Sequence, residues 1–104
     1  MENEFDKLTL IVQASFTGVI GYGSVFKCHV LKNTEGNFDE QDITVTILTG
    51  DTSNLAFISS HAGKAVFEMG CKKLNENEPY ALMPISGFVD SHKTSWEIMY
   101  LREH

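Results

Sequence analysis

The chain has 104 residues, of which 42% are hydrophobic and 21% charged, and its 8 basic and 14 acidic residues give a net charge of −6. This length accommodates one domain, and the hydrophobic fraction argues against wholesale disorder. No apolar run approaches the ~20 residues needed to cross a bilayer. The N-terminal residues are acidic where a secretory signal would be basic, so we expect a cytoplasmic protein. We expect an acidic tail over residues 1–7 and a single β-barrel domain over residues 8–104.

Alternation of apolar and polar residues dominates the sequence and predicts β-strands. From Leu8 to Phe16 the even positions are apolar and the odd positions are mostly polar. This first strand continues past Gly18, a residue type that often marks a bulge or a bend inside a long strand. Gly21-Tyr22-Gly23 then predicts a turn, because both glycines accept a positive φ.

Further segments of the same kind follow along the chain. Strands are expected over residues 24–32, 43–48, 65–74, 80–89 and 95–102. In the last of them, Trp96, Ile98 and Tyr100 fall on one face.

A single short helix is expected between the third and fourth of these strands. Residues 50–54 offer several side chains that can cap a helix N-terminus. Leu55, Ile58 and Ala62 follow at helical spacing and form one apolar stripe, and Gly63 suits the position just past the C-terminus.

The order of three strands, a short helix and further strands resembles the oligonucleotide/oligosaccharide-binding (OB) fold, a small Greek-key barrel. The long first strand with Gly18, the segment 26–36 followed by 43–45, and the glycine-preceded segment 63–70 all agree with that fold. The resemblance extends over residues 8–102 and rests on element order. It implies a mainly β protein with an OB-like barrel of five to six strands. Residues 80–102 hold two strands where a five-stranded barrel has one, so a barrel with an extra strand and a β-sandwich with one helix are alternatives.

The reactive residue types do not form a recognisable catalytic or metal-binding pattern. Cys28 and Cys71 each lie among alternating apolar residues, so we expect buried free thiols, with a cross-strand disulfide as the alternative. Cys28 and His29 are adjacent, which in a strand directs their side chains to opposite faces. The acidic loop 35–42 lacks the ligand spacing of a calcium loop. We therefore expect no catalytic residue, no cofactor and no metal, and a small Cys/His-dependent enzyme is kept as an alternative function.

The segment 78–89 differs from the other strands because it has two prolines and apolar residues on both faces. Aromatic and methionine side chains suit a binding surface, since they bury much area with adaptable contacts. We predict a non-catalytic binding or interaction module for an unknown protein or small ligand, with a homodimer as one form of association. Its ligand or partner surface is assigned to Tyr22, Tyr80, Met83 and Phe88.

Single-stranded nucleic acid is the alternative partner, because this is a common ligand of the OB fold. The second and fourth strands with their approaches carry a positive balance, and Lys27, Lys72 and Lys73 are the predicted contacts. The acidic net charge and the single arginine make nucleic acid the less favoured partner.

Overall fold

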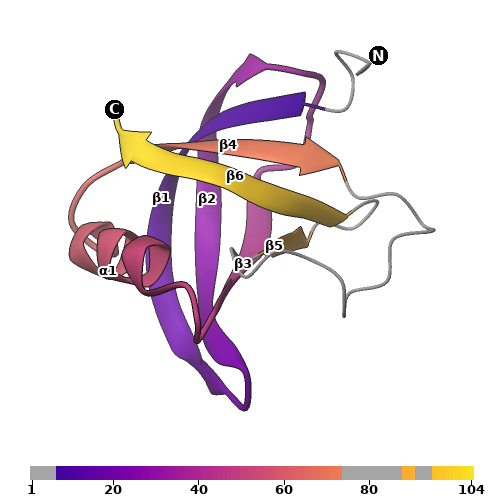
Figure 1. Cartoon of the computed structure of the whole chain (residues 1–104). Coiled ribbons are helices and arrows are strands. Elements are labelled where there is room, and N and C mark those ends of the chain that lie inside the picture. Colours follow the sequence, from indigo (N-terminus) through magenta and orange to yellow (C-terminus); the bar gives the residue numbers. More distant parts are fainter. Residues whose placement is uncertain (1–6, 74–87, 91–94) are drawn as a thin grey trace.

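The computed structural model describes residues 7–73, 88–90 and 95–104. In chain order the elements are β1 (Lys7–Ile20), β2 (Gly23–Glu35), β3 (Asp42–Leu48), α1 (Thr52–His61), β4 (Phe67–Lys73), β5 (Phe88–Asp90) and β6 (Ser95–Glu103) (Figure 1). The prediction of a mainly β protein with one short helix between the third and fourth strands is confirmed. β1 begins at Lys7, one residue before the predicted domain boundary, and residues 1–6 lie outside the described part of the chain.

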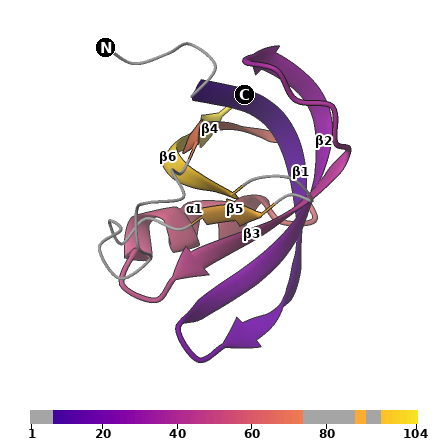
Figure 2. The same ribbon diagram turned by 90° about the vertical axis from the view of Figure 1, so that its right-hand side faces the viewer.

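The strands pair antiparallel in the order β1-β2-β3-β5-β6-β4, and β4 pairs in turn with β1, which closes the ladder into a barrel (Figure 2). β1 makes this closure possible because it serves two neighbours. It pairs with β2 from Thr9 to Ile20, but with β4 only from Lys7 to Val12. The second half of β1 therefore pairs with β2 alone, and the two strands project from the barrel as a hairpin. Figure 1 shows the tip of this hairpin reaching past the helix and the other strands.

Irregular positions bend these strands. In the β1–β2 pairing, Phe16 lies opposite Phe26 and Gly18 opposite Val25, so Thr17 is an extra residue in β1. The irregularity predicted at Gly18 is thus present at the preceding residue. Two further shifts in the same pairing lie between Thr9 and Leu10 and between Ile11 and Val12. The pairing of β4 with β6 has one shift, where Met99 is the extra residue of β6. Such bulges increase the local twist that a small closed barrel requires.

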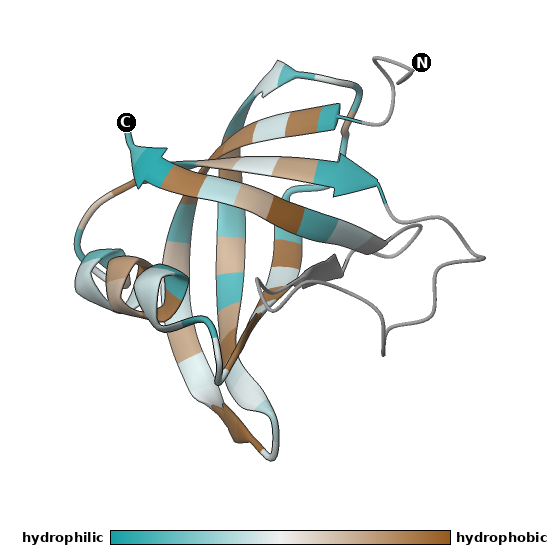
Figure 3. Ribbon diagram, viewed as in Figure 1, coloured by the Kyte–Doolittle hydropathy of each residue, from teal (hydrophilic) through white to brown (hydrophobic). Residues whose placement is uncertain are grey.

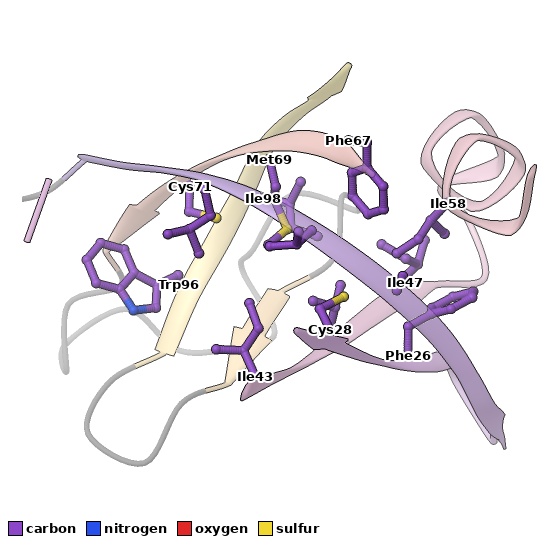
Figure 4. Close-up of a cluster of buried hydrophobic side chains, with 14 of the residues drawn as sticks. Phe26, Cys28, Ile43, Ile47, Ile58, Phe67, Met69, Cys71, Trp96 and Ile98 are labelled. Carbon is purple, nitrogen blue, oxygen red and sulfur yellow. The ribbon is translucent and has the colours of Figure 1, made fainter. Parts of the chain in front are cut away.

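The barrel interior holds one cluster of buried side chains drawn from all the long strands and the helix, as the close-up in Figure 4 shows. α1 packs across one end of the barrel and buries Ile58 in this cluster, with Leu55 and Ala62 packed against it. The predicted helical stripe is therefore confirmed. Asp51 caps the helix by accepting a hydrogen bond from the Asn54 backbone N–H. No helix among the described residues is long and apolar enough to cross a membrane.

Three expectations from the sequence need correction. Neither Gly21 nor Gly23 has a positive φ; Gly23 is required instead by close packing, because a Cβ there would lie 2.5 Å from the Ile47 carbonyl oxygen. Thr9 and Ile11, expected on the polar side of the first strand, are buried. Tyr100 does not share a face with Trp96 and Ile98, because the extra residue Met99 reverses the alternation between them.

Candidate functional site

Two surfaces stand out among the described residues, and the first is the end of the β1–β2 hairpin, residues 15–25, called here the hairpin arm. Its side chains Phe16, Val19 and Tyr22 are 56%, 75% and 59% exposed, and brown bands mark its lower end in Figure 3. Residues 13–26 include no charged side chain, in a chain that carries 22 of them. Exposed apolar side chains grouped on an uncharged segment are typical of an interaction surface.

The extra residue Thr17 determines which side chains of the arm share a face. Phe16 lies opposite Phe26, and Val19 lies opposite Ser24. Ser24 and Phe26 are two residues apart on β2 and so point to the same side. Phe16 and Val19 therefore extend the interior face of the barrel beyond its end, and the Phe16 ring packs edge-on against the buried Phe26 ring at 5.5 Å.

The arm is held in place at both its bulge and its turn. The Thr17 hydroxyl donates to the Val25 carbonyl at 2.9 Å, across the hairpin. The Thr49 N–H, just after β3, donates to the Tyr22 carbonyl at 3.0 Å. Together with the close packing of Gly23 on Ile47, these contacts fix the arm before any partner binds, which lowers the entropic cost of binding.

The structure describes only part of the predicted ligand or partner surface. Tyr22 is exposed at the turn of the arm. Phe88 begins β5, and its backbone lies opposite Thr46 of β3 and Glu97 of β6. Tyr80 and Met83 lie outside the described residues. The structure adds Phe16 and Val19 to Tyr22.

The second surface, called here the outer groove, lies on the outside of the barrel where β1, β4 and β6 run side by side. It has a volume of about 350 Å³ and is lined by Lys7, Leu8, Thr9, Glu35, Gly70, Cys71, Lys72, Met99 and Tyr100. Two rows of cross-strand neighbours define it. Lys7 is opposite Lys72, which is opposite Glu97, and in the next row Thr9 is opposite Gly70, which is opposite Tyr100.

Hydrogen bonds fix the polar walls of the groove. The Thr9 hydroxyl donates to Glu35 Oε1 at 2.9 Å, which holds that carboxylate over β1. The Asn33 amide braces the same strand end by donating to the Thr9 carbonyl at 3.1 Å and to the Glu35 carbonyl at 2.7 Å. The groove therefore has ordered walls on its β1–β2 side.

A network of three side chains bounds the groove on its β4–β6 side. The Arg102 guanidinium forms an ion pair with Glu68 Oε2 and lies 5.0 Å from the centre of the Tyr100 ring. The Tyr100 hydroxyl donates to the same Glu68 oxygen at 3.0 Å. The hydrogen bond from Arg102 lowers the pKa of Glu68, and burial together with the neighbouring carboxylate raises the pKa of Tyr100.

The three lysines predicted for nucleic acid do not form one surface. Lys27 lies between Ser15 of β1 and Thr44 of β3, whereas Lys72 lies opposite Lys7 at the other end of β1. Ser15 and Lys7 are separated by roughly 26 Å along an extended strand. Lys72 and Lys73 are consecutive strand residues, so they point to opposite faces of the sheet. Of the three, only Lys72 lines the outer groove.

Both cysteines are free and buried in the core, as predicted, and Figure 4 shows them among the apolar side chains of the interior. Burial raises the pKa of Cys28 and of Cys71 to about 12. A thiol acts as a nucleophile in its ionised form, and burial disfavours that form of both residues in this conformation.

Two of the described histidines, His29 and His61, are engaged in structural contacts. The His61 ring stacks on Phe57 at 4.1 Å, its Nδ1 lies 2.9 Å from the Phe57 carbonyl and its Nε2 lies 3.4 Å from Glu103. His29 Nδ1 lies 3.2 Å from the Asp42 carboxylate. Within residues 7–73 and 95–104, no cluster of three His, Cys, Asp or Glu side chains could hold a metal ion.

Sequence reasoning missed most of both surfaces. Phe16 follows four buried even-numbered residues, so alternation alone placed it in the core. The length of β1 was the available signal for an exposed arm. Its 14 residues span roughly 46 Å at 3.3 Å each, which is more than a small barrel can cover. The groove depends on which strands become neighbours in the sheet, and no local sequence pattern reveals that order.

The chain matches no protein-family model, no curated protein and no solved structure.

Proposed function

We propose that the chain is a non-catalytic interaction module on an OB-like barrel, and that it binds an apolar surface of a partner protein through the hairpin arm. The single observation that carries this proposal is the exposure of Phe16, Val19 and Tyr22 on an arm without charged residues. An exposed strand end in a soluble protein is ordinarily protected by charged side chains. The absence of such protection is a cost to solubility that a binding role explains.

The OB-like assignment draws support from connectivity. The helix lies between β3 and β4, and the first strand pairs with both β2 and β4. In OB folds the loop between the first two strands commonly borders the ligand, and the hairpin arm occupies that place in this chain. The cytoplasmic location expected from the sequence stays a prediction.

The experiment compares the unaltered protein with Val19→Lys, each immobilised and exposed to soluble extract of the source cells. A lysine at this position places a charge at the most exposed apolar side chain of the arm. Leu31→Lys is the matched control, because Leu31 is 52% exposed, lies on β2 away from the arm and also exchanges an exposed aliphatic side chain for lysine. Retained proteins are quantified by mass spectrometry.

The proposal expects at least one protein that the unaltered chain and Leu31→Lys retain equally and that Val19→Lys loses. Direct binding of that protein, once purified, is then measured with the same three chains. Equal retention by all three chains, or retention of nothing by any of them, would overturn the assignment of the arm as the binding surface.

A further inference from the structure

The hairpin arm has an open strand edge, and the chemistry of this edge bears on the kind of partner that the arm takes. β1 pairs with β4 only as far as Val12, so beyond that residue its side away from β2 has no neighbour among the described strands (Figure 1). The Ala14 carbonyl accepts a hydrogen bond from the N–H of Gly63, just after α1, at 2.8 Å. The open stretch therefore runs from Ser15 to Ile20, where the strand ends.

The backbone groups that face this edge belong to Phe16 and Val19. In an antiparallel pair, both backbone groups of a residue point to the same side, and the side alternates along the strand. The Val30 N–H donates at 2.7 Å to the carbonyl just before β3, so the even-numbered residues of β2 direct their backbone groups toward β3. Ser24 and Phe26 share this direction. Val19 and Phe16 lie opposite them on β1, so their N–H and C=O groups point to the open edge.

The extra residue Thr17 does not interrupt the edge. Phe16 and Val19 are three residues apart in sequence, but they lie opposite residues of β2 that are two apart. Their separation along the edge is therefore that of a regular strand, with the extra residue bulging out between them. An extended segment can pair with both, and pairing of this kind selects a partner that is itself a strand.

We infer that the partner of the hairpin arm is a second copy of this chain, paired antiparallel along the open edge. Phe16 of each copy then lies opposite Val19 of the other, which is a self-complementary contact about a two-fold axis. In this register Ile20 of one copy reaches Ser15 of the other and fills the open stretch, one residue short of the Ala14 carbonyl that Gly63 already occupies. The inference rests on the function proposed above, since the contact is the same arm.

Charge and side-chain chemistry favour a second copy as the occupant. Each chain carries a net charge of −6, so two copies approach most easily where neither has a charged side chain, and residues 13–26 have none. The register places a phenylalanine opposite a valine twice, and aromatic and β-branched side chains form favourable cross-strand pairs. The open edge selects an extended, uncharged, apolar strand, and the arm is such a strand.

The first test is the association state of the full chain, measured by sedimentation velocity from about 10 μM to about 1 mM. We expect a reversible equilibrium between monomer and dimer, with a weak dimer, because one strand pair buries less area than a standard interface. Val19→Lys should weaken the dimer by at least about tenfold, since it places two like charges in the contact. Leu31→Lys, exposed on β2 away from the arm, should change the dissociation constant less than about twofold.

Amide hydrogen exchange distinguishes strand pairing from contact between side chains alone. The N–H groups of Phe16 and Val19 face the open edge, so their protection should rise with protein concentration. Those of Gly18 and Ile20 lie opposite odd-numbered residues of β2 and face that strand already, so their protection should change much less. In a mixture of isotope-labelled and unlabelled chains, filtered NMR spectra should show contacts between the Phe16 ring of one copy and the Val19 methyl groups of the other.

Two further variants separate the backbone of position 19 from its side chain. Val19→Pro removes the N–H that faces the open edge, whereas Val19→Thr keeps it together with the β-branched shape. The dissociation constant of the dimer should therefore rise much more for proline than for threonine. If Val19→Pro does not fold, the exchange of the Phe16 and Val19 amides in the unaltered chain decides the question.

The outcomes distinguish this inference from the proposed function. A chain that is monomeric at every concentration, while the retention experiment yields another protein that Val19→Lys loses, overturns the second copy and leaves the arm as the binding surface. A dimer that Val19→Lys does not weaken, together with equal retention by all three chains, overturns both. A dimer that Val19→Lys weakens without added protection at Phe16 and Val19 overturns pairing along the strand edge.

Discussion

The Tyr100 ring lies against Gly70 of the neighbouring strand, in the space that a side chain at position 70 would occupy. The aromatic ring thereby covers backbone that the glycine leaves bare, an arrangement that stabilises glycines within sheets. Gly70→Ala would force the ring away, and we expect a loss of roughly 1–3 kcal/mol in the free energy of unfolding, the usual cost of overpacking. Urea unfolding followed by the fluorescence of Trp96, the sole tryptophan, measures it.

Two matched glycines and one background variant control this prediction. Nothing lies within 4 Å of a Cβ built at Gly18 or Gly21, so alanine there should leave the free energy of unfolding unchanged or slightly higher. In a Tyr100→Ala background the cost of Gly70→Ala should fall, because the ring is already gone. Equal losses at Gly70 and Gly18 would contradict the packing argument.

The ion pair of Glu68 and Arg102 should make stability depend on pH in a defined direction. Arg102 holds the pKa of Glu68 below its usual value of 4.5. A carboxylate with a lowered pKa in the folded state stabilises that state above the unfolded pKa, and the contribution disappears as pH falls through the folded value. The stability difference between the unaltered protein and Glu68→Gln should therefore be greatest near neutral pH and shrink progressively in acid.

Chemical unfolding at a series of pH values measures this difference. Arg102→Gln supplies the control, since adding it to Glu68→Gln should have little further effect once the partner charge is absent. A difference that stays constant from neutral pH to well below 4.5 would show that the ion pair does not set the pKa of Glu68.

The two buried thiols should be unreactive in the folded protein. Burial raises the pKa of both to about 12, so the ionised fraction at pH 8 is very small, and the core excludes the reagent. We expect Ellman's reagent to detect no thiol within minutes under native conditions and two per chain in denaturant. Rapid reaction of one thiol in the folded state would reopen the alternative of a reactive cysteine.

The cap of α1 should contribute measurably to stability. Asp51 accepts from the Asn54 N–H at 3.1 Å and from its side-chain amide at 2.8 Å. Asp51→Ala should lower the free energy of unfolding by about 1 kcal/mol, whereas Asp51→Asn should cost less, because asparagine is also a good cap. Ser53→Ala, at an exposed position of the same first turn, should be nearly neutral; a loss there equal to that in Asp51→Ala would argue against capping as the cause.

The sequence was informative where structure depends on local pattern. Alternation identified the long strands, and the cap residues with the stripe containing Ile58 located the helix. The sequence failed to predict the structure where one extra residue in a strand reverses the faces on which the following side chains lie. Met99 is an ordinary apolar residue by sequence, yet as the extra residue of β6 it moves Tyr100 off the face that it was expected to share with Trp96 and Ile98.

The candidate sites were the least predictable part. Tyr22 was identified because it lies in a turn, a local feature. Phe16 was assigned to the core because nothing in its neighbourhood reveals that β4 stops pairing with β1 at Val12. The pairing of Lys7 with Lys72 joins residues far apart in the chain, and only strand order brings them together.

The double role of β1 also has a consequence for the order in which the chain folds. Its contacts with β2 join residues on either side of one tight turn, so this hairpin closes a short loop and forms at little entropic cost. Its contacts with β4 pair Leu8 with Cys71, which requires most of the chain to be gathered first. Closure of the barrel is therefore the late step, and until it occurs the apolar first half of β1 has one neighbour instead of two.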